Sequence, residues 1–172
     1  MADGLYFAYG SNINLEQMAC RCPDACVVRP VCLEDNELLF RRGGFATIAP
    51  KAGSRVHGLL WSITRSCERS LDWYEGYPRF YDKRTVTVRD GLGRSLSVMA
   101  YIMDERFKEP MLPTTGYYNG ILEGYRCSGL PAAALKEAWD HAVEEIHAET
   151  ERINNAFIKR GRPLKGGNSH ER

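Results

Sequence analysis

The sequence predicts an α+β protein, with a β-rich first two thirds and a long C-terminal helix. Short apolar or alternating runs broken by glycine fill the first part, and Arg84–Arg89 alternates as a half-buried strand does. The last part repeats apolar residues every three or four positions, which is the spacing of one helical face. These residues are Leu135, Trp139, Ala142, Ile146, Thr150, Ile153 and Phe157.

Length and composition fit one globular domain. The 172 residues are 44% hydrophobic and 26% charged, which allows a sizeable core. A formal net charge of +1 argues against bulk attraction to nucleic acid or to an anionic membrane. No apolar run is long enough to span a membrane, and no signal peptide precedes Tyr6. We expect a cytoplasmic protein with a domain at 1–160 and a disordered polar tail at 161–172.

The first predicted strand, Leu5–Tyr9, ends at a glycine. Gly10 permits a sharp bend and close approach of the backbone, and Asn12 can cap a helix over residues 14–18. Such a junction leaves backbone N–H groups unpaired, which favours an anion or a developing oxyanion. An ordinary tight turn is the alternative interpretation.

Several short strands should follow, at Val27–Leu33, Glu37–Arg41, Phe45–Ala49 and Val56–Ile63. Gly58 inside the last of these indicates a bulge or close packing. Ser66 should cap a helix that ends near Glu75 and Gly76, since Pro78 prevents its continuation.

A predicted hairpin comes next. The turn signal at residues 90–93 joins Arg84–Arg89 to a return strand at Leu96–Met103. A loop over 105–115 precedes a helix at Gly116–Tyr125, and the final helix begins at Pro131. Its apolar face should pack on the sheet, while a partner-binding or homodimer helix is the alternative.

The sequence offers no convincing metal site. Cys20, Cys22 and Cys26 lie close together but lack the paired spacing of zinc knuckles, and no histidine is near. Reduced cysteines are the usual state in a cytosolic chain. None of the four histidines forms an i,i+4 pair. We therefore expect neither a metal nor another cofactor.

Glu75 is the strongest candidate for acid–base chemistry. It ends a helix, where the dipole disfavours a carboxylate, and Trp73, Tyr74 and Tyr77 flank it. Desolvation by these aromatic neighbours would raise its pKa and suit it to proton transfer near neutral pH. A solvated surface glutamate is the alternative.

The two stretches together, Tyr6–Asn12 and then Glu75-Gly76-Tyr77, resemble the γ-glutamylcyclotransferase family. Further segments agree in order over residues 5 to 135: Gly44–Ile48, Val56–Trp61, Ser70–Asp72, Tyr117 and Gly129–Pro131. One departure is conservative, because Ile13 stands where leucine is common in the family.

The resemblance implies a curved or barrel-like, mainly antiparallel sheet packed by several helices. It also implies an enzyme that needs no metal, nucleotide or water. The α-amine of a γ-glutamyl amide attacks the γ-carbonyl, and 5-oxoproline and a free amine or amino acid result. Glu75 would be catalytic. The implied substrate-binding residues are Tyr6, Phe7, Ala8, Tyr9, Gly10, Ser11 and Tyr117.

Several points stay open in the sequence. The Tyr9–Ser11 donors could hold the oxyanion or the substrate's α-carboxylate. The leaving group could be an amino acid, a dipeptide, an amine, a lysine side chain or a carrier-bound acyl amine. Arg41 and Arg42 could clamp a substrate carboxylate or form a solvated strand end. A non-catalytic binding module for a small anion is the alternative function.

Overall fold

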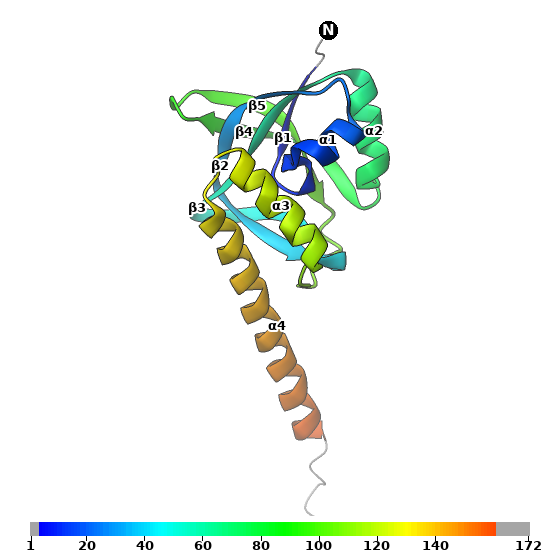
Figure 1. Cartoon of the computed structure of the whole chain (residues 1–172). Coiled ribbons are helices and arrows are strands. Elements are labelled where there is room, and N and C mark those ends of the chain that lie inside the picture. Colours follow the sequence, from blue (N-terminus) through cyan, green and yellow to red (C-terminus); the bar gives the residue numbers. More distant parts are fainter. Residues whose placement is uncertain (1–3, 161–172) are drawn as a thin grey trace, which may run out of the picture.

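The computed structural model describes residues 4–160, so the expected tail at 161–172 lies outside the described residues. Five strands form a closed barrel in the order β1-β3-β2-β4-β5 (Figure 1). All neighbouring pairs are antiparallel except β1 and β5, which are parallel. The expected α+β class and barrel-like sheet are confirmed. The strands are β1 (Gly4–Ala8), β2 (Cys26–Arg41), β3 (Phe45–Ile63), β4 (Tyr81–Asp90) and β5 (Ser95–Met103).

Helices and short turns link and cover these strands. A single 3-10 turn, η1 (Ser11–Ile13), joins β1 to α1 (Leu15–Arg21), and a second, η2 (Arg42–Gly44), joins β2 to β3. The remaining helices are α2 (Arg65–Glu75), α3 (Thr115–Cys127) and α4 (Ala132–Arg160). None of the helices in residues 4–160 combines the length and hydropathy that a membrane crossing requires.

The four strands expected between residues 27 and 63 are wrong in number, because they form two long strands. β2 and β3 pair along their whole length, from Cys26 opposite Ser62 to Arg41 opposite Phe45. The polar residues around Asp35, which lie between two of the predicted strands, stand instead at a shift in the β2–β3 pairing register between Glu34 and Asn36. Asp35 takes a positive φ of 52° there, so the strand bends without ending.

Two predicted helix caps are also wrong by two residues. Asn14, not Asn12, caps α1, and its side chain accepts a hydrogen bond from the N–H of Gln17. Thr64, not Ser66, caps α2 and accepts from the N–H of Cys67. In each case a second capping residue stands two positions away, and local propensity does not separate the two. The shift leaves Asn12 free for another role.

Gly58 confirms the prediction of close packing. A Cβ at this position would lie 2.2 Å from the carbonyl oxygen of Ala8 and 2.5 Å from the ring of Phe7. Any side chain would push β1 away from β3, so Gly58 allows β1 to pair at its close distance. The β1 strand in turn carries the loop that begins at Tyr9.

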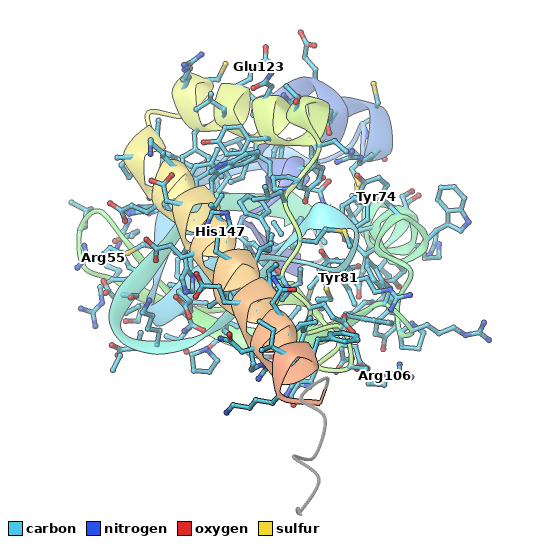
Figure 2. All side chains as sticks on the ribbon, turned by 90° about the horizontal axis from the view of Figure 1, so that it is seen from below. Arg55, Tyr74, Tyr81, Arg106, Glu123 and His147 are labelled. Carbon is cyan, nitrogen blue, oxygen red and sulfur yellow. The ribbon has the colours of Figure 1, made fainter. Side chains whose placement is uncertain are left out.

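The final helix divides into a packed half and a projecting half. Leu135, Ala138 and Ala142 are buried against the domain, which confirms the predicted packing for this part. Ile153 and Phe157 are instead 47% and 72% exposed. The apolar face of α4 therefore continues past the part of the helix that packs on the domain. Figure 1 shows α4 running away from the barrel, and Figure 2 shows it from below, with His147 near its middle.

Candidate active site

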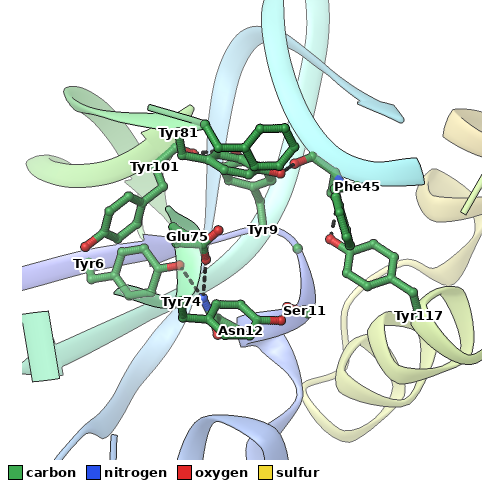
Figure 3. Close-up of a pocket in the computed structure, with 13 residues that line it drawn as sticks. Tyr6, Tyr9, Ser11, Asn12, Phe45, Tyr74, Glu75, Tyr81, Tyr101 and Tyr117 are labelled. Carbon is green, nitrogen blue, oxygen red and sulfur yellow. Dashed lines mark hydrogen bonds between the residues drawn. The ribbon is translucent and has the colours of Figure 1, made fainter. Parts of the chain in front are cut away.

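A cavity of about 210 Å³ opens where the β1–α1 loop meets the end of α2 (Figure 3). The loop and Glu75 share it, as expected of substrate-binding and catalytic residues of one site, although they lie more than sixty positions apart. Its lining comes from segments that are far apart between residues 6 and 117 and is mostly aromatic: Tyr6, Tyr9, Gly10, Ser11, Asn12, Phe45, Ala46, Tyr74, Glu75, Phe80, Tyr81, Tyr101 and Tyr117.

Glu75 is the single acidic or basic side chain among these lining residues. It is the last residue of α2, which stops because Gly76 takes a left-handed conformation with φ of 65°. Burial raises the pKa of the Glu75 carboxyl to about 7. The positive charge of Arg21 and a hydrogen bond from Asn12 oppose this rise without cancelling it. The carboxyl can therefore bind and release a proton near neutral pH.

The neighbours that bury Glu75 differ from those that the sequence suggested. Trp73 is 86% exposed and Tyr77 is 39% exposed, and neither lines the cavity. Of the three flanking aromatic residues, only Tyr74 faces it. The direction of the pKa shift agrees with the prediction, but most of the residues that share the cavity with Glu75 are distant in sequence, so sequence proximity cannot identify them.

Asn12, which the sequence indicated only as a helix cap, is a site residue through its side chain. Its Nδ2 donates to Oε1 of Glu75 and to the hydroxyl of Tyr6, each at 2.9 Å. The available signal was the pair of asparagines at positions 12 and 14. Only Asn14 can cap α1 in the observed geometry, which leaves Asn12 to face the cavity.

Five of the six tyrosines that line the cavity fall into two groups by hydrogen bonding. Tyr9, Tyr81 and Tyr101 donate their O–H groups to the protein, to the carbonyls of residues 101 and 46 and to the carboxylate of Asp72. Tyr6 and Tyr117 instead accept hydrogen bonds, from Asn12 Nδ2 and from the N–H of Ala46. Burial raises the pKa of both phenols, so each keeps its proton. Their O–H groups can therefore donate to a ligand.

Five of the seven predicted substrate-binding residues line this cavity: Tyr6, Tyr9, Gly10, Ser11 and Tyr117. Phe7 and Ala8 do not line it, because they are fully buried in the barrel beside Gly58. Strand alternation accounts for Phe7, since successive side chains of β1 point to opposite faces. Of the other lining residues, Phe45 and Ala46 lie on β3, Tyr81 on β4 and Tyr101 on β5, while Phe80 lies just before β4 and Tyr74 lies beside Glu75 on α2.

Gly10 stands at the point where the loop approaches β3 and α3. A Cβ there would lie 3.3 Å from both the Cβ of Ala46 and the hydroxyl of Tyr117. Its φ is −109°, so the need for glycine comes from space and not from a left-handed backbone. The chain bends at Gly10, as predicted.

We expect Gly10→Val to lower kcat/KM roughly 10- to 100-fold, because its methyl groups would displace Tyr117 and fill the cavity. The loss of unfolding free energy should stay within about 1–3 kcal/mol, since the added atoms face the cavity rim. Steady-state kinetics beside urea unfolding checks both values. Gly10→Ala should give an intermediate loss, and wild-type kcat/KM in folded Gly10→Val would contradict the assignment.

Neither arginine proposed as a carboxylate clamp lines the cavity. Arg41 forms a two-point ion pair with Glu145 of α4, at 2.7 and 3.0 Å. Arg42 places its guanidinium 5.3 Å from the ring centre of Phe107. Arg41 thus ties β2 to α4, and the clamp interpretation is not supported for it.

The cysteine cluster does not converge. Cys22 is buried, with its Sγ 3.5 Å from the carbonyl of Cys67, and burial raises its pKa to about 12. Cys20 and Cys26 are exposed. Within residues 4–160, no group of three or more histidine, cysteine or carboxylate side chains is placed to hold a metal ion. Asp72 accepts hydrogen bonds from Lys83 Nζ and from the Tyr101 hydroxyl.

Comparison with known proteins gives consistent results. A family model described as "Gamma-glutamyl cyclotransferase, AIG2-like" matches residues 6–120. The chain is 33% identical over 168 residues to gamma-glutamylcyclotransferase of Bos taurus, covering 91% of this chain and 88% of that protein. It is 34% identical over 141 residues to the Homo sapiens protein of the same name, covering 74% and 72%.

Two solved structures share the fold. One, named gamma-glutamyl cyclotransferase, superposes with a TM-score of 0.71 at 30% identity and covers 78% of this chain and 85% of its own. YkqA from Bacillus subtilis superposes with a TM-score of 0.66 at 22% identity, over 80% of this chain and 53% of its own.

Proposed function

The chain belongs to the gamma-glutamyl cyclotransferase, AIG2-like family, and we infer from this that it converts γ-glutamyl amides to 5-oxoproline. The reaction is an intramolecular acyl transfer. The α-amine attacks the γ-carbonyl, a five-membered ring closes, and a free amine or amino acid leaves. One observation supports this chemistry most directly: a lone carboxyl with a pKa of about 7 lies in a cavity otherwise lined by neutral groups.

We assign the proton transfers to Glu75. The substrate's α-ammonium must lose a proton before it can attack, and the departing nitrogen must gain one. A carboxyl whose pKa is near the working pH can do both in turn, first as base and then as acid. In a cavity this small, the α-ammonium that gives up the proton and the leaving nitrogen that receives one would both lie near Glu75. The folded substrate therefore needs no second acid–base residue.

We propose that two sets of hydrogen-bond donors in the cavity hold the substrate's oxygens. One set is the Tyr6 and Tyr117 hydroxyls, whose protons remain available. The other set is in the β1–α1 loop, where the N–H groups of Ile13 and Asn14 close the η1 turn and those at its start do not. One set would hold the α-carboxylate and the other the developing oxyanion.

A panel of γ-glutamyl amides tests this function and resolves the leaving group. It should contain γ-glutamyl amino acids, a dipeptide, an alkylamine, a lysine side-chain conjugate and a carrier-bound acyl amine. We expect 5-oxoproline from at least one member. The matched control is the same compound with its α-amine acetylated, which cannot cyclise. Absence of 5-oxoproline across the panel would favour the non-catalytic anion-binding alternative.

We propose a homodimer through the projecting half of α4. Its apolar residues Ile153, Phe157 and Ile158 are exposed, and a lone projecting helix gains little stability from propensity alone. The stretch 144–151 is acidic, while 152–159 carries Arg152 and Lys159. Antiparallel pairing would set the acidic stretch of one copy against the basic stretch of the other.

We expect the wild-type protein to sediment as a dimer and Phe157→Glu as a monomer, because a buried carboxylate would disrupt the apolar seam. Analytical ultracentrifugation at several concentrations measures this. Leu92→Glu, an equally drastic change at an exposed turn, should leave the dimer intact. A monomeric wild type at high micromolar concentration would contradict the proposal.

We also propose a cytoplasmic location, where thiols such as exposed Cys20 and Cys127 stay reduced.

A further inference from the structure

We propose that Arg21 is a positioning residue which fixes the amide of Asn12 and so decides which oxygen of Glu75 carries the transferred proton. The inference rests on the proposed function of Glu75 as the proton shuttle. Arg21 is the last residue of α1 and does not line the cavity itself. Its effect would reach the reacting atoms through Asn12.

The guanidinium of Arg21 joins the β1–α1 loop, α1 and α2 at one point. Nη1 donates to Asn12 Oδ1 at 2.6 Å and to Ser11 Oγ at 3.1 Å. Nη2 donates to Gln17 Oε1 at 2.8 Å and to the Tyr74 hydroxyl at 2.7 Å. The guanidinium carbon also lies 3.7 Å from the ring centre of Tyr74. A planar fork held by four partners leaves Arg21 little freedom.

This contact settles the orientation of the Asn12 side chain. An amide has one acceptor end and one donor end, and a guanidinium can only donate. Oδ1 of Asn12 must therefore face Arg21. Nδ2 then points to Glu75 and Tyr6, at 2.9 Å from each acceptor. A flipped amide would set its NH₂ against the guanidinium and its oxygen against the carboxylate.

The orientation of Asn12 makes the two oxygens of Glu75 unequal. Oε1 accepts the Nδ2–H hydrogen bond in either protonation state, so the mobile proton belongs on Oε2. The α-ammonium passes a proton to Oε2, and the freed lone pair forms the new C–N bond. When the old C–N bond breaks, the leaving nitrogen takes the same proton. The ring nitrogen gives its second proton to the ionised Oε2, and the freed amine takes that proton and leaves as an ammonium. Oε2 carries the proton in each transfer, so the carboxyl does not need to rotate.

Arg21 also contributes its charge to the pH dependence of Glu75. The other titratable side chains that line the cavity are phenols: Tyr6, Tyr9, Tyr74, Tyr81, Tyr101 and Tyr117. The Arg21 cation opposes the effect of burial on the Glu75 pKa. Geometry and charge can therefore be separated experimentally, since lysine keeps the charge and loses the fork.

The test compares Arg21→Gln, Arg21→Lys and Arg126→Gln in kcat and in the pH profile of kcat/KM. Arg21→Gln should lower kcat roughly 10- to 100-fold. It should also move the acid limb, the fall of kcat/KM on the acidic side of the pH profile, to higher pH. Arg21→Lys should restore the limb toward its wild-type position while kcat stays low. Arg126 occupies the last turn of α3 and is exposed, so its replacement should change neither quantity.

Asn12→Asp provides a second route if the Arg21 variants do not fold. It keeps an acceptor for Arg21 and replaces the donor facing Glu75 by a like charge, so the acid limb should again move to higher pH. Wild-type kcat and an unshifted limb in folded Arg21→Gln, or in Asn12→Asp, would overturn the inference. That failure is distinct from failure of the proposed function, in which the wild type would make no 5-oxoproline or Glu75→Gln would remain active.

Discussion

Replacement of Glu75 by glutamine is expected to lower kcat about 10²- to 10⁴-fold, the usual contribution of a positioned acid–base residue. Glutamine keeps the size of the side chain, and its carbonyl can still accept the hydrogen bond from Asn12. It cannot exchange a proton near neutral pH. Substrate binding should remain, measured as the Kd of a γ-glutamyl amide by calorimetry.

The wild-type pH profile belongs to the same prediction. Because Glu75 must be ionised to act as a base, kcat/KM should fall tenfold for each pH unit below a midpoint of about 7. Wild-type turnover in folded Glu75→Gln would disprove the assigned role. An acid limb near pH 4.5, the ordinary value for a glutamate, would show that burial does not tune this carboxyl.

Stability gives an independent control on Glu75. Its pKa is higher in the folded state than in the unfolded state, so folding favours the protonated form. The associated stability is fully present below about pH 4.5 and is lost as the pH rises through 7. Glu75→Gln should therefore unfold at higher denaturant concentration than wild type at pH 8. The upper limit of this gain is about 3 kcal/mol, reduced because solvent reaches the half-buried side chain.

The largest effect on folding is expected for Gly58→Ala. The new methyl group would lie 2.2 Å from the carbonyl oxygen of Ala8, and this clash involves backbone that no rotamer change can relieve. β1 must then separate from β3 at the pair Ala8–Leu59. We expect a loss of about 3 kcal/mol or more in the free energy of unfolding, beyond ordinary overpacking.

Gly4→Ala is the matched control for Gly58→Ala. Gly4 lies in β1, and a Cβ there meets no atom within 4 Å. Its replacement should change stability by no more than about 0.5 kcal/mol. Urea unfolding of the two variants provides the comparison. Equal midpoints would mean that β1 has more room beside β3 than the structure allows. Activity should fall with Gly58→Ala as well, because β1 carries the Tyr9–Asn12 loop.

Much of the site was predictable because its two essential stretches carry local signals. The strand–glycine–turn at Tyr6–Asn12 alone also fits an ordinary tight turn, and the helix end at Glu75-Gly76 alone also fits a surface glutamate. The two stretches in this order resemble one family, and that combination identified the site. Tyr81 and Tyr101 had no such signal. They reach the cavity through the pairing of β4 with β5 and the closure of the barrel, and a strand residue does not reveal its partner strand.

The fold was predicted less accurately where local rules allow two answers. Polar residues around Asp35 fit a turn as well as a bulge, so one long β2 could not be told from two short strands. Asn12 and Asn14 are equally good caps, and the choice depends on Glu75, far away in the sequence. The apolar spacing of α4 is the same before and after His147. Periodicity indicates a buried face but not whether the partner lies in the same chain.

The most direct test of the central claim is to run the reaction in H₂¹⁸O with a γ-glutamyl amide and identify the product by mass spectrometry. Cyclisation by the substrate's own α-amine uses no water. The wild-type protein should therefore release 5-oxoproline that carries no ¹⁸O, in equal amount to the freed amine. Glutamate labelled with ¹⁸O would instead show that water attacks the γ-carbonyl, and would contradict the assignment of this cavity to intramolecular acyl transfer.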